Sequence, residues 1–247
     1  MTADDRAFWG KDLSGSQFRN VVMVDVDIDG FLSDVRVYGV DVLPLVEAEL
    51  DRLHPERVLL RSDDPVEVRA GWSILRAKWE EATTRAVAAG VDESIEEEWS
   101  HAQTLRHLVF ATDAWMRRPV LGDTCHYWWG DLPHSELPPA GAAALGLDAA
   151  RVPTWEQVAA ARTAQLDLIT GYLAAATPEE LQRPCAPPAN AEEYPPASEW
   201  LGRPAVRCLR VVFQEEWHHL RYALRDLPVI EARGSADGSS DDSTEIQ

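Results

Sequence analysis

The residues best suited to chemistry are a glutamate and a histidine four positions apart, Glu215 and His219, in a segment whose pattern predicts a helix. Side chains at positions i and i+4 lie one above the other on the same side of a helix. A carboxylate oxygen and a neutral imidazole nitrogen both coordinate divalent cations at ~2.0–2.2 Å. Two interpretations are open at this point: the pair holds a metal ion, or it is a buried hydrogen-bonded pair that fixes packing.

A second helical segment supplies a third ligand candidate, His107. The residues that share its stripe at helical spacing are small: Thr104, Ala111 and Ala114. Small neighbours leave a gap beside an inward imidazole, which suits a metal ion with open coordination positions. His107, Glu215 and His219 together resemble in type the three-ligand sets of catalytic zinc sites. The adjacent His218 falls in an arginine-bearing stripe and is expected to face water, and His101 is expected at the surface.

Four long amphipathic segments must position these side chains. Their starts are marked by residues that cap helices, namely Asp64 before Pro65, Ser100 with Gln103, and Thr154 with Gln157. The last segment runs from about Pro204 to Leu227, ahead of Pro228. The pattern predicts a mainly α protein, a four-helix bundle over residues 46–232, with a long connection between its second and third helices.

That connection contains aromatic and potentially reactive residues: Cys125, His126, Trp128, Trp129 and His134. They either line a substrate pocket at the mouth of the bundle or cover its end, and the second interpretation is favoured. Residues 233–247 are rich in Gly, Ser and Asp and are expected to form a disordered acidic tail.

The first 45 residues follow a different pattern. Valines alternate with aspartates before Asp29-Gly30, which predicts a β-hairpin. A second period of five is also present, in which Leu13, Phe18, Met23, Ile28, Ser33, Tyr38 and Leu43 recur. That period is typical of pentapeptide repeats, so a short β segment of either kind is expected at residues 1–45.

The charge balance limits the partners. With 42 acidic and 23 basic residues, the chain has a formal net charge of −19 and is expected to bind neither nucleic acid nor anionic membranes. The N-terminus lacks the features of a signal peptide, which predicts a cytoplasmic location. Three cysteines without close spacing argue against a disulfide framework and against a cysteine zinc site.

Two segments resemble the DinB-like family of four-helix-bundle metalloproteins. Residues 99–115 are similar to the family's second helix, in which the ligand histidine corresponds to His107, and residues 215–227 are similar to its last helix. The resemblance covers roughly residues 65–230, and the pentapeptide-like lead-in looks like one actinobacterial branch. Many members use a His-x-x-x-His pair, but Tyr222 and Ala223 occupy the places of its second histidine. The set here is instead similar to the His, Glu, His site of mycothiol-dependent maleylpyruvate isomerases.

The resemblance implies a divalent-metal-dependent transferase or isomerase that uses a low-molecular-weight thiol as co-substrate and a small electrophile as substrate. Zinc is the expected ion, with nickel or another divalent ion as the alternative. Tyr222, one turn after His219, is a candidate acid or base, and core packing is its alternative role. Two other functions stay open: a non-catalytic metal-binding or stress-response protein, and an interaction module that uses the N-terminal β segment. A homodimer is compatible with either.

Overall fold

The computed structural model describes most of the chain, namely residues 8, 11–96, 98–123, 127–133, 137–148, 150–186, 195 and 197–238, with the backbone alone at 197 and 235–238. These residues fall into two compact units, Met1–Ala48 and Glu49–Gln247, which are described separately. The expected mainly α architecture with a short N-terminal β segment is confirmed. No helix in the described ranges is long and apolar enough to cross a membrane.

The first unit contains a two-stranded antiparallel hairpin, β1 (Arg36–Val37) and β2 (Val40–Asp41). Its two-residue turn, Tyr38-Gly39, has positive φ at both positions, as a type I′ hairpin turn requires. The hairpin therefore lies after Asp29-Gly30, and the expectation of a turn at that dipeptide was wrong. Positive φ angles do recur five residues apart, at Gly15, Asn20, Asp25 and Gly30. The apolar side chains of the same period are exposed from Leu13 to Tyr38, so the pentapeptide-like coil stays a prediction.

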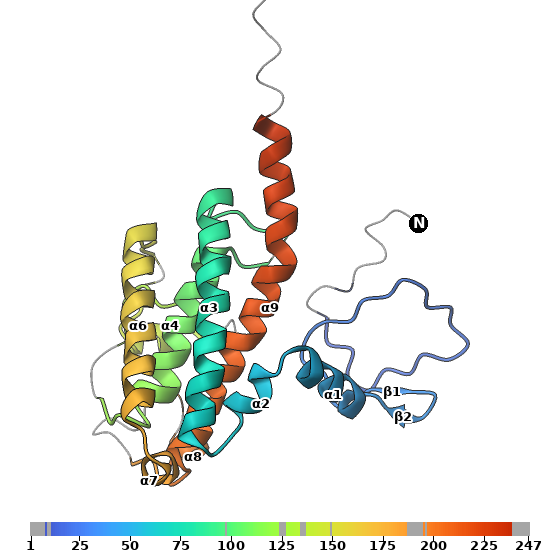
Figure 1. Cartoon of the computed structure of the whole chain (residues 1–247). Helices are drawn as coiled ribbons and strands as arrows, with labels where there is room; N and C mark the ends of the chain where they lie inside the picture. The colour runs from blue at the N-terminus through green and yellow to red at the C-terminus, as the bar shows by residue number, and fades with distance from the viewer. Residues whose placement is uncertain are drawn as a thin grey trace, which may run out of the picture. The chain divides into compact units, whose positions relative to one another are not determined.

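The rest of the described chain is helical (Figure 1). Its elements are α1 (Leu43–Leu53), α2 (Glu56–Leu60), α3 (Pro65–Ala89), α4 (His101–Thr112), the π-helix η2 (Asp113–Arg117), α5 (Pro139–Ala144), α6 (Trp155–Ala175), α7 (Pro178–Gln182), α8 (Ala197–Trp200) and α9 (Ala205–Gly238). The predicted caps are present. The Asp64 carboxylate accepts from the Val66 amide, and capping boxes begin α4 at Ser100 and α6 at Thr154.

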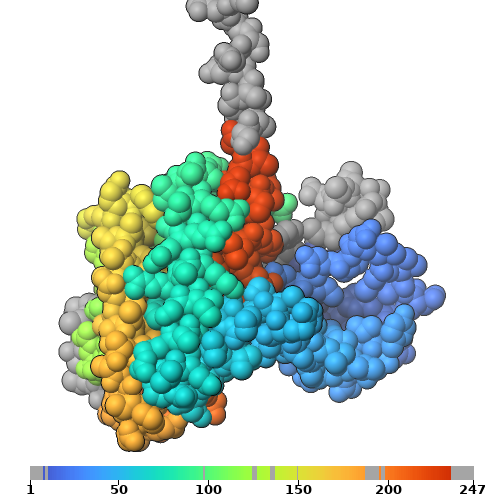
Figure 2. Space-filling model, in the orientation of Figure 1, coloured from blue at the N-terminus to red at the C-terminus, as the bar shows by residue number. Residues whose placement is uncertain are grey.

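The four long helices α3, α4, α6 and α9 form a bundle. Contacts join α3 to α9, α9 to α4, α4 to α6 and α6 to α3, which closes a ring of four. Figure 2 shows the side chains of α3 and α6 meeting along one face of this bundle. The helix that bears the predicted ligand pair, α9, thus lies between α3 and the helix that bears His107, α4.

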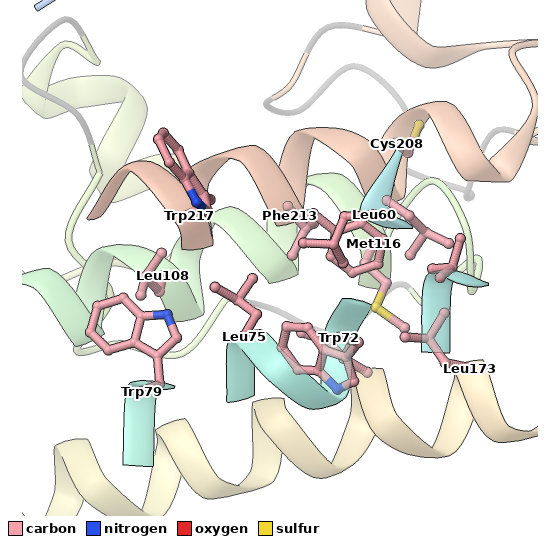
Figure 3. Close-up of a cluster of buried hydrophobic side chains, with 14 of the residues drawn as sticks. Leu60, Trp72, Leu75, Trp79, Leu108, Met116, Leu173, Cys208, Phe213 and Trp217 are labelled. Atoms are coloured by element: carbon pink, nitrogen blue, oxygen red, sulfur yellow. The ribbon is translucent and has the colours of Figure 1, made fainter. Parts of the chain in front are cut away.

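The interior of the bundle is filled by the apolar stripes read from the sequence. The stripe of α3 is buried throughout and consists of Val68, Trp72, Leu75, Trp79, Ala82 and Ala86. In Figure 3, Trp72 and Leu75 from α3 lie around the same interior as Leu108 from α4 and Phe213 from α9. Burial of each large apolar side chain stabilises the fold by about 1.5–3 kcal/mol, so this core holds the four helices together.

The end of α9 differs from the expectation. The helix continues through Pro228 to Gly238 instead of ending at Leu227. Proline removes one main-chain hydrogen bond, but Leu227 and Ile230 on either side of it are buried and anchor the segment to the bundle. The first residues of the expected tail are therefore helical, and residues 239–247 lie outside the described part of the chain.

Candidate metal centre

The structure brings the three predicted ligands together between α4 and α9. One donor atom from each of His107, Glu215 and His219 lies within 4.8 Å of the other two. The Glu215 Oε2 atom is 3.4 Å from His107 Nε2 and 3.4 Å from His219 Nε2. Two atoms that each lie ~2.0–2.2 Å from a tetrahedral ion are roughly 3.3–3.6 Å apart, so this group could hold a divalent metal ion.

The tautomer of His107 supports the same conclusion. Its Nδ1 lies 2.9 Å from the main-chain carbonyl oxygen of Leu132. A carbonyl oxygen only accepts, so Nδ1 donates, and Nε2 of the neutral ring keeps its lone pair. That lone pair then faces the Glu215 carboxylate, and two acceptors at this distance need a cation between them. A metal ion or an added proton satisfies the arrangement.

Electrostatics keep Glu215 ionised. Burial on its own opposes the charged form of this carboxyl group. The hydrogen bonds and charges of His107 and His219 outweigh that effect and hold the pKa of Glu215 well below its ordinary value of 4.5. The Glu215 carboxylate oxygen and the two imidazole nitrogens are the kinds of donor atom that zinc accepts.

Aromatic rings surround the two histidines. Trp99, just before the N-cap of α4, is stacked on His219 at 5.8 Å between ring centroids and lies 4.8 Å from His107. Tyr222 meets His219 edge-on at 5.9 Å, and Phe110 lies 6.2 Å from His107. These rings restrict the orientations of the two imidazoles. Sequence reasoning did not single out Trp99, although its place directly before a capping box was a usable signal.

A cavity of about 100 Å³ adjoins the site on the side of His219. Aromatic and apolar residues line it together with three acidic ones, Glu93, Glu98 and Asp226. Tyr222 also lines this cavity, which places the candidate acid or base beside a ligand histidine. Its catalytic role stays a prediction.

His101 lines the same cavity, and the expectation that it lies at the surface was wrong. The residue is 8% exposed, and its Nε2 lies 3.1 Å from the Thr83 hydroxyl oxygen. Burial first, and then the positive charge of Arg162, lower the pKa of His101 to about 4. A first-turn histidine is buried here because the rings of Trp79 and Trp155 pack around it. His101 is therefore a neutral polar group beside the site.

A buried polar network lies next to the metal group and was not recognised from the sequence. The Glu216 carboxylate, 0% exposed, accepts from Arg162 Nη1 at 2.5 Å and Nη2 at 2.7 Å. Gln165 donates to Glu216 at 3.1 Å, and it also contacts the Thr112 hydroxyl. The network thus ties α6 to both helices that carry ligands. Arg162 and Gln165 occupy core positions of α6 between Val158 and Ile169, which was the available signal.

The connection after α4 holds His107 through its main chain. Arg106 Nε donates to the Gly130 carbonyl at 2.6 Å, and the next residue but one, Leu132, supplies the carbonyl for His107. Trp128 from this connection packs on the main core, which agrees with the interpretation that the aromatic residues cover the bundle. Cys125, His126 and His134 lie outside the described residues.

Comparison with known proteins decides the family. The sequence pattern that defines the DinB superfamily matches residues 74–223, more than half of the 247-residue chain and all three candidate ligands. The chain belongs to the DinB superfamily. No curated protein and no solved structure matches it. Membership agrees with the helical bundle and is consistent with a group that could hold a divalent metal ion.

Proposed function

We propose that this DinB-superfamily chain is a divalent-metal-dependent transferase or isomerase that uses a low-molecular-weight thiol, of the mycothiol type, as co-substrate. The observation that carries the proposal is the convergence of His107, Glu215 and His219 beside a cavity that His219 lines. Three protein ligands leave coordination positions free for a small molecule, as catalytic zinc sites require. Zinc is the proposed ion, and nickel is the alternative.

The chemistry follows from the charge at the site. A bound divalent cation lowers the pKa of a coordinated thiol, whose ordinary value is ~8.5, and so supplies a thiolate at neutral pH. The residues of the chain hold and orient this centre. Leu132 fixes the ring of His107, Trp99 and Tyr222 fix His219, and the ionised Glu215 keeps the net charge of the loaded site low.

The cavity limits the reacting part of the second substrate. Its volume of about 100 Å³ is below the ~300–1,000 Å³ typical of pockets that enclose a whole drug-sized ligand. It therefore suits a small electrophile, or the reacting end of a larger one. Tyr222 and the neutral His101 both border this space and can donate a hydrogen bond to a polar atom of the substrate.

Metal content and thiol consumption test the proposal. We expect the purified chain to carry about one divalent ion, and His107→Ala and Glu215→Ala to lose it, because two ligands seldom retain zinc. His218→Ala is the matched control, since His218 lies on the same helix but outside the metal group, and it should keep the ion. Unchanged metal content in both ligand variants would overturn the site.

The second measurement separates catalysis from binding alone. The loaded chain is mixed with a low-molecular-weight thiol and a panel of small electrophiles, and loss of free thiol is followed. Metal-dependent thiol consumption that disappears in Glu215→Ala supports the proposal. Full metal occupancy without thiol binding refutes the transferase and leaves a non-catalytic metal-binding or stress-response protein.

A further inference from the structure

Two buried cysteines lie side by side at the start of α9, away from the metal group. The Sγ atoms of Cys185 and Cys208 are 3.7 Å apart, and the residues are 2% and 1% exposed. Cys208 lies on α9, at the edge of the core drawn in Figure 3, and Cys185 follows α7. Neither takes part in the metal group or in the buried network around Glu216.

The main chain fixes this juxtaposition. Pro184 and Pro204 form an isolated antiparallel bridge, in which the Cys185 amide donates to the Arg203 carbonyl at 2.8 Å. The Cys185 carbonyl accepts from the Gly202 amide at 3.0 Å. The segment before α8 is thereby held against the first turn of α9. A disulfide requires an S–S distance of ~2.05 Å, so the two sulfurs need to approach by less than about 2 Å.

We propose that Cys185 and Cys208 form a redox-active dithiol that reduces a low-molecular-weight disulfide and is itself converted to an intramolecular disulfide. The Cys185 thiolate attacks one sulfur of the small disulfide, forms a mixed disulfide and releases one small thiolate. The Cys208 thiol then loses its proton and attacks Cys185 Sγ, which releases the second small thiolate. Two electrons pass from the dithiol to the small disulfide, and two small thiols are the product.

The electrostatic surroundings decide which sulfur attacks first. The hydrogen bond from Cys208 lowers the pKa of Cys185 against the opposing effect of burial, and the charge of Arg183 lowers it further. The same hydrogen bond, together with burial, raises the pKa of Cys208. Cys185 is therefore the nucleophile and Cys208 the resolving thiol. Because both are buried, the small disulfide reaches Cys185 only when the bridge at Pro184 opens, and the reaction is slower than that of an exposed thiol.

The Cys185–Cys208 disulfide would restrict the motion of the start of α9. Cys208 precedes the ligand Glu215 by seven residues, about two helical turns. A disulfide to Cys185 links the first turn of α9 covalently to the segment after α7. It also prevents the main-chain bridge between Pro184 and Pro204 from opening. This reaction of the two cysteines is independent of whether the metal group is catalytic.

Oxidation of the folded full-length chain by oxidised glutathione tests the proposal. We expect intact mass to fall by about 2 Da, the loss of two hydrogens, and peptide mapping after alkylation to show a Cys185–Cys208 bond that dithiothreitol reverses. The mapping also reports Cys125, so its reaction is distinguished. The oxidised chain should unfold at a temperature roughly 5–15 °C higher than the reduced chain.

Cys208→Ser is the matched variant, and it should stop at a mixed disulfide on Cys185, with a mass gain of one glutathione. Two results would overturn the proposal. One is a folded wild-type chain whose two thiols stay reduced and alkylatable only after unfolding, while the unfolded chain oxidises readily. The other is wild-type protein that accumulates a stable mixed disulfide or an intermolecular dimer instead of the internal bond. The wild-type result decides even where the variant fails to fold.

Discussion

Replacement of Glu216 by glutamine should be among the most destabilising single changes in this protein. Glu216→Gln keeps the shape of the side chain but removes the charge that Arg162 and Gln165 bind. Arg162 is 5% exposed, so its guanidinium group is left charged in the interior with no carboxylate partner. The remaining acceptors, the amide oxygens of residues 165 and 216, carry no net charge.

The size of the effect follows from this burial. Removal of one partner from a buried ion pair costs about 3–5 kcal/mol in the free energy of unfolding. In a domain of this size each kcal/mol changes the melting temperature by about 2–4 °C, so a decrease of roughly 6–20 °C is expected. Urea unfolding followed by tryptophan fluorescence and by circular dichroism measures the change in the free energy of unfolding, since the buried Trp72, Trp79 and Trp200 report on the core.

The same substitution elsewhere on α9 is the control. Glu231 pairs with Arg85 at 2.8 Å, but the two side chains are 38% and 31% exposed. Exposed ion pairs contribute about 0–1 kcal/mol, so Glu231→Gln should change stability by less than that. Equal effects of Glu216→Gln and Glu231→Gln would refute the argument from burial. The double variant Arg162→Met/Glu216→Leu should be more stable than Glu216→Gln, because it leaves no charge buried alone.

Three further changes test other parts of the structure. Burial raises the pKa of Asp113 to about 6, so the stability linked to its protonated form is present below pH 3.8 and is lost as pH rises through 6. In urea unfolding, Asp113→Asn should therefore gain stability relative to wild type as the pH rises from 4 to 7. A stability difference that does not change with pH would contradict this. Trp99→Ala should weaken metal binding by about 10–100-fold in a competitive chelator titration, with Trp99→Phe closer to wild type, because the ring orients both ligand histidines. Gly71→Ala should destabilise the fold by about 1–3 kcal/mol, because the added Cβ would lie 2.9 Å from the Cβ of Leu59. Gly171→Ala should stabilise it by up to about 1 kcal/mol, because no atom lies within 4 Å of the added Cβ. Similar effects at the two glycines would show that helix propensity outweighs packing.

The sequence predicts the bundle well because the signals for it are local. Capping residues such as Asp64 and Ser100 act within one turn, and the apolar stripe of α3 follows from helical spacing alone. The same local geometry places Glu215 and His219 on one side of α9. Pro228 is the exception, since proline usually ends a helix, and here buried residues on both sides keep the helix continuous.

Partners that lie far apart in the sequence could not be assigned in this way. Nothing in the spacing of α6 indicates that Arg162 meets Glu216, 54 residues later, because that pairing depends on how two helices are rotated against each other. His101 was misplaced for a related reason. A first-turn residue is normally solvated, and its burial comes from Trp79 on α3 and Trp155 on α6, which no local pattern brings together.

The adjacent glutamates of α9 show why these long-range contacts matter for the site. Consecutive residues on a helix point about 100° apart, so Glu215 can face His107 on α4 while Glu216 faces Arg162 on α6. A rotation of α9 that removed either carboxylate from its partners would remove both. The apolar stripe tolerates small rotations, but a bidentate ion pair does not, because an unpaired buried charge costs several kcal/mol. The Arg162–Glu216 pair therefore restricts α9 to the rotation at which Glu215 and His219 meet His107. On this reasoning the double variant Arg162→Met/Glu216→Leu recovers stability but binds metal more weakly than wild type, and wild-type affinity in that variant would show that the core alone sets the site.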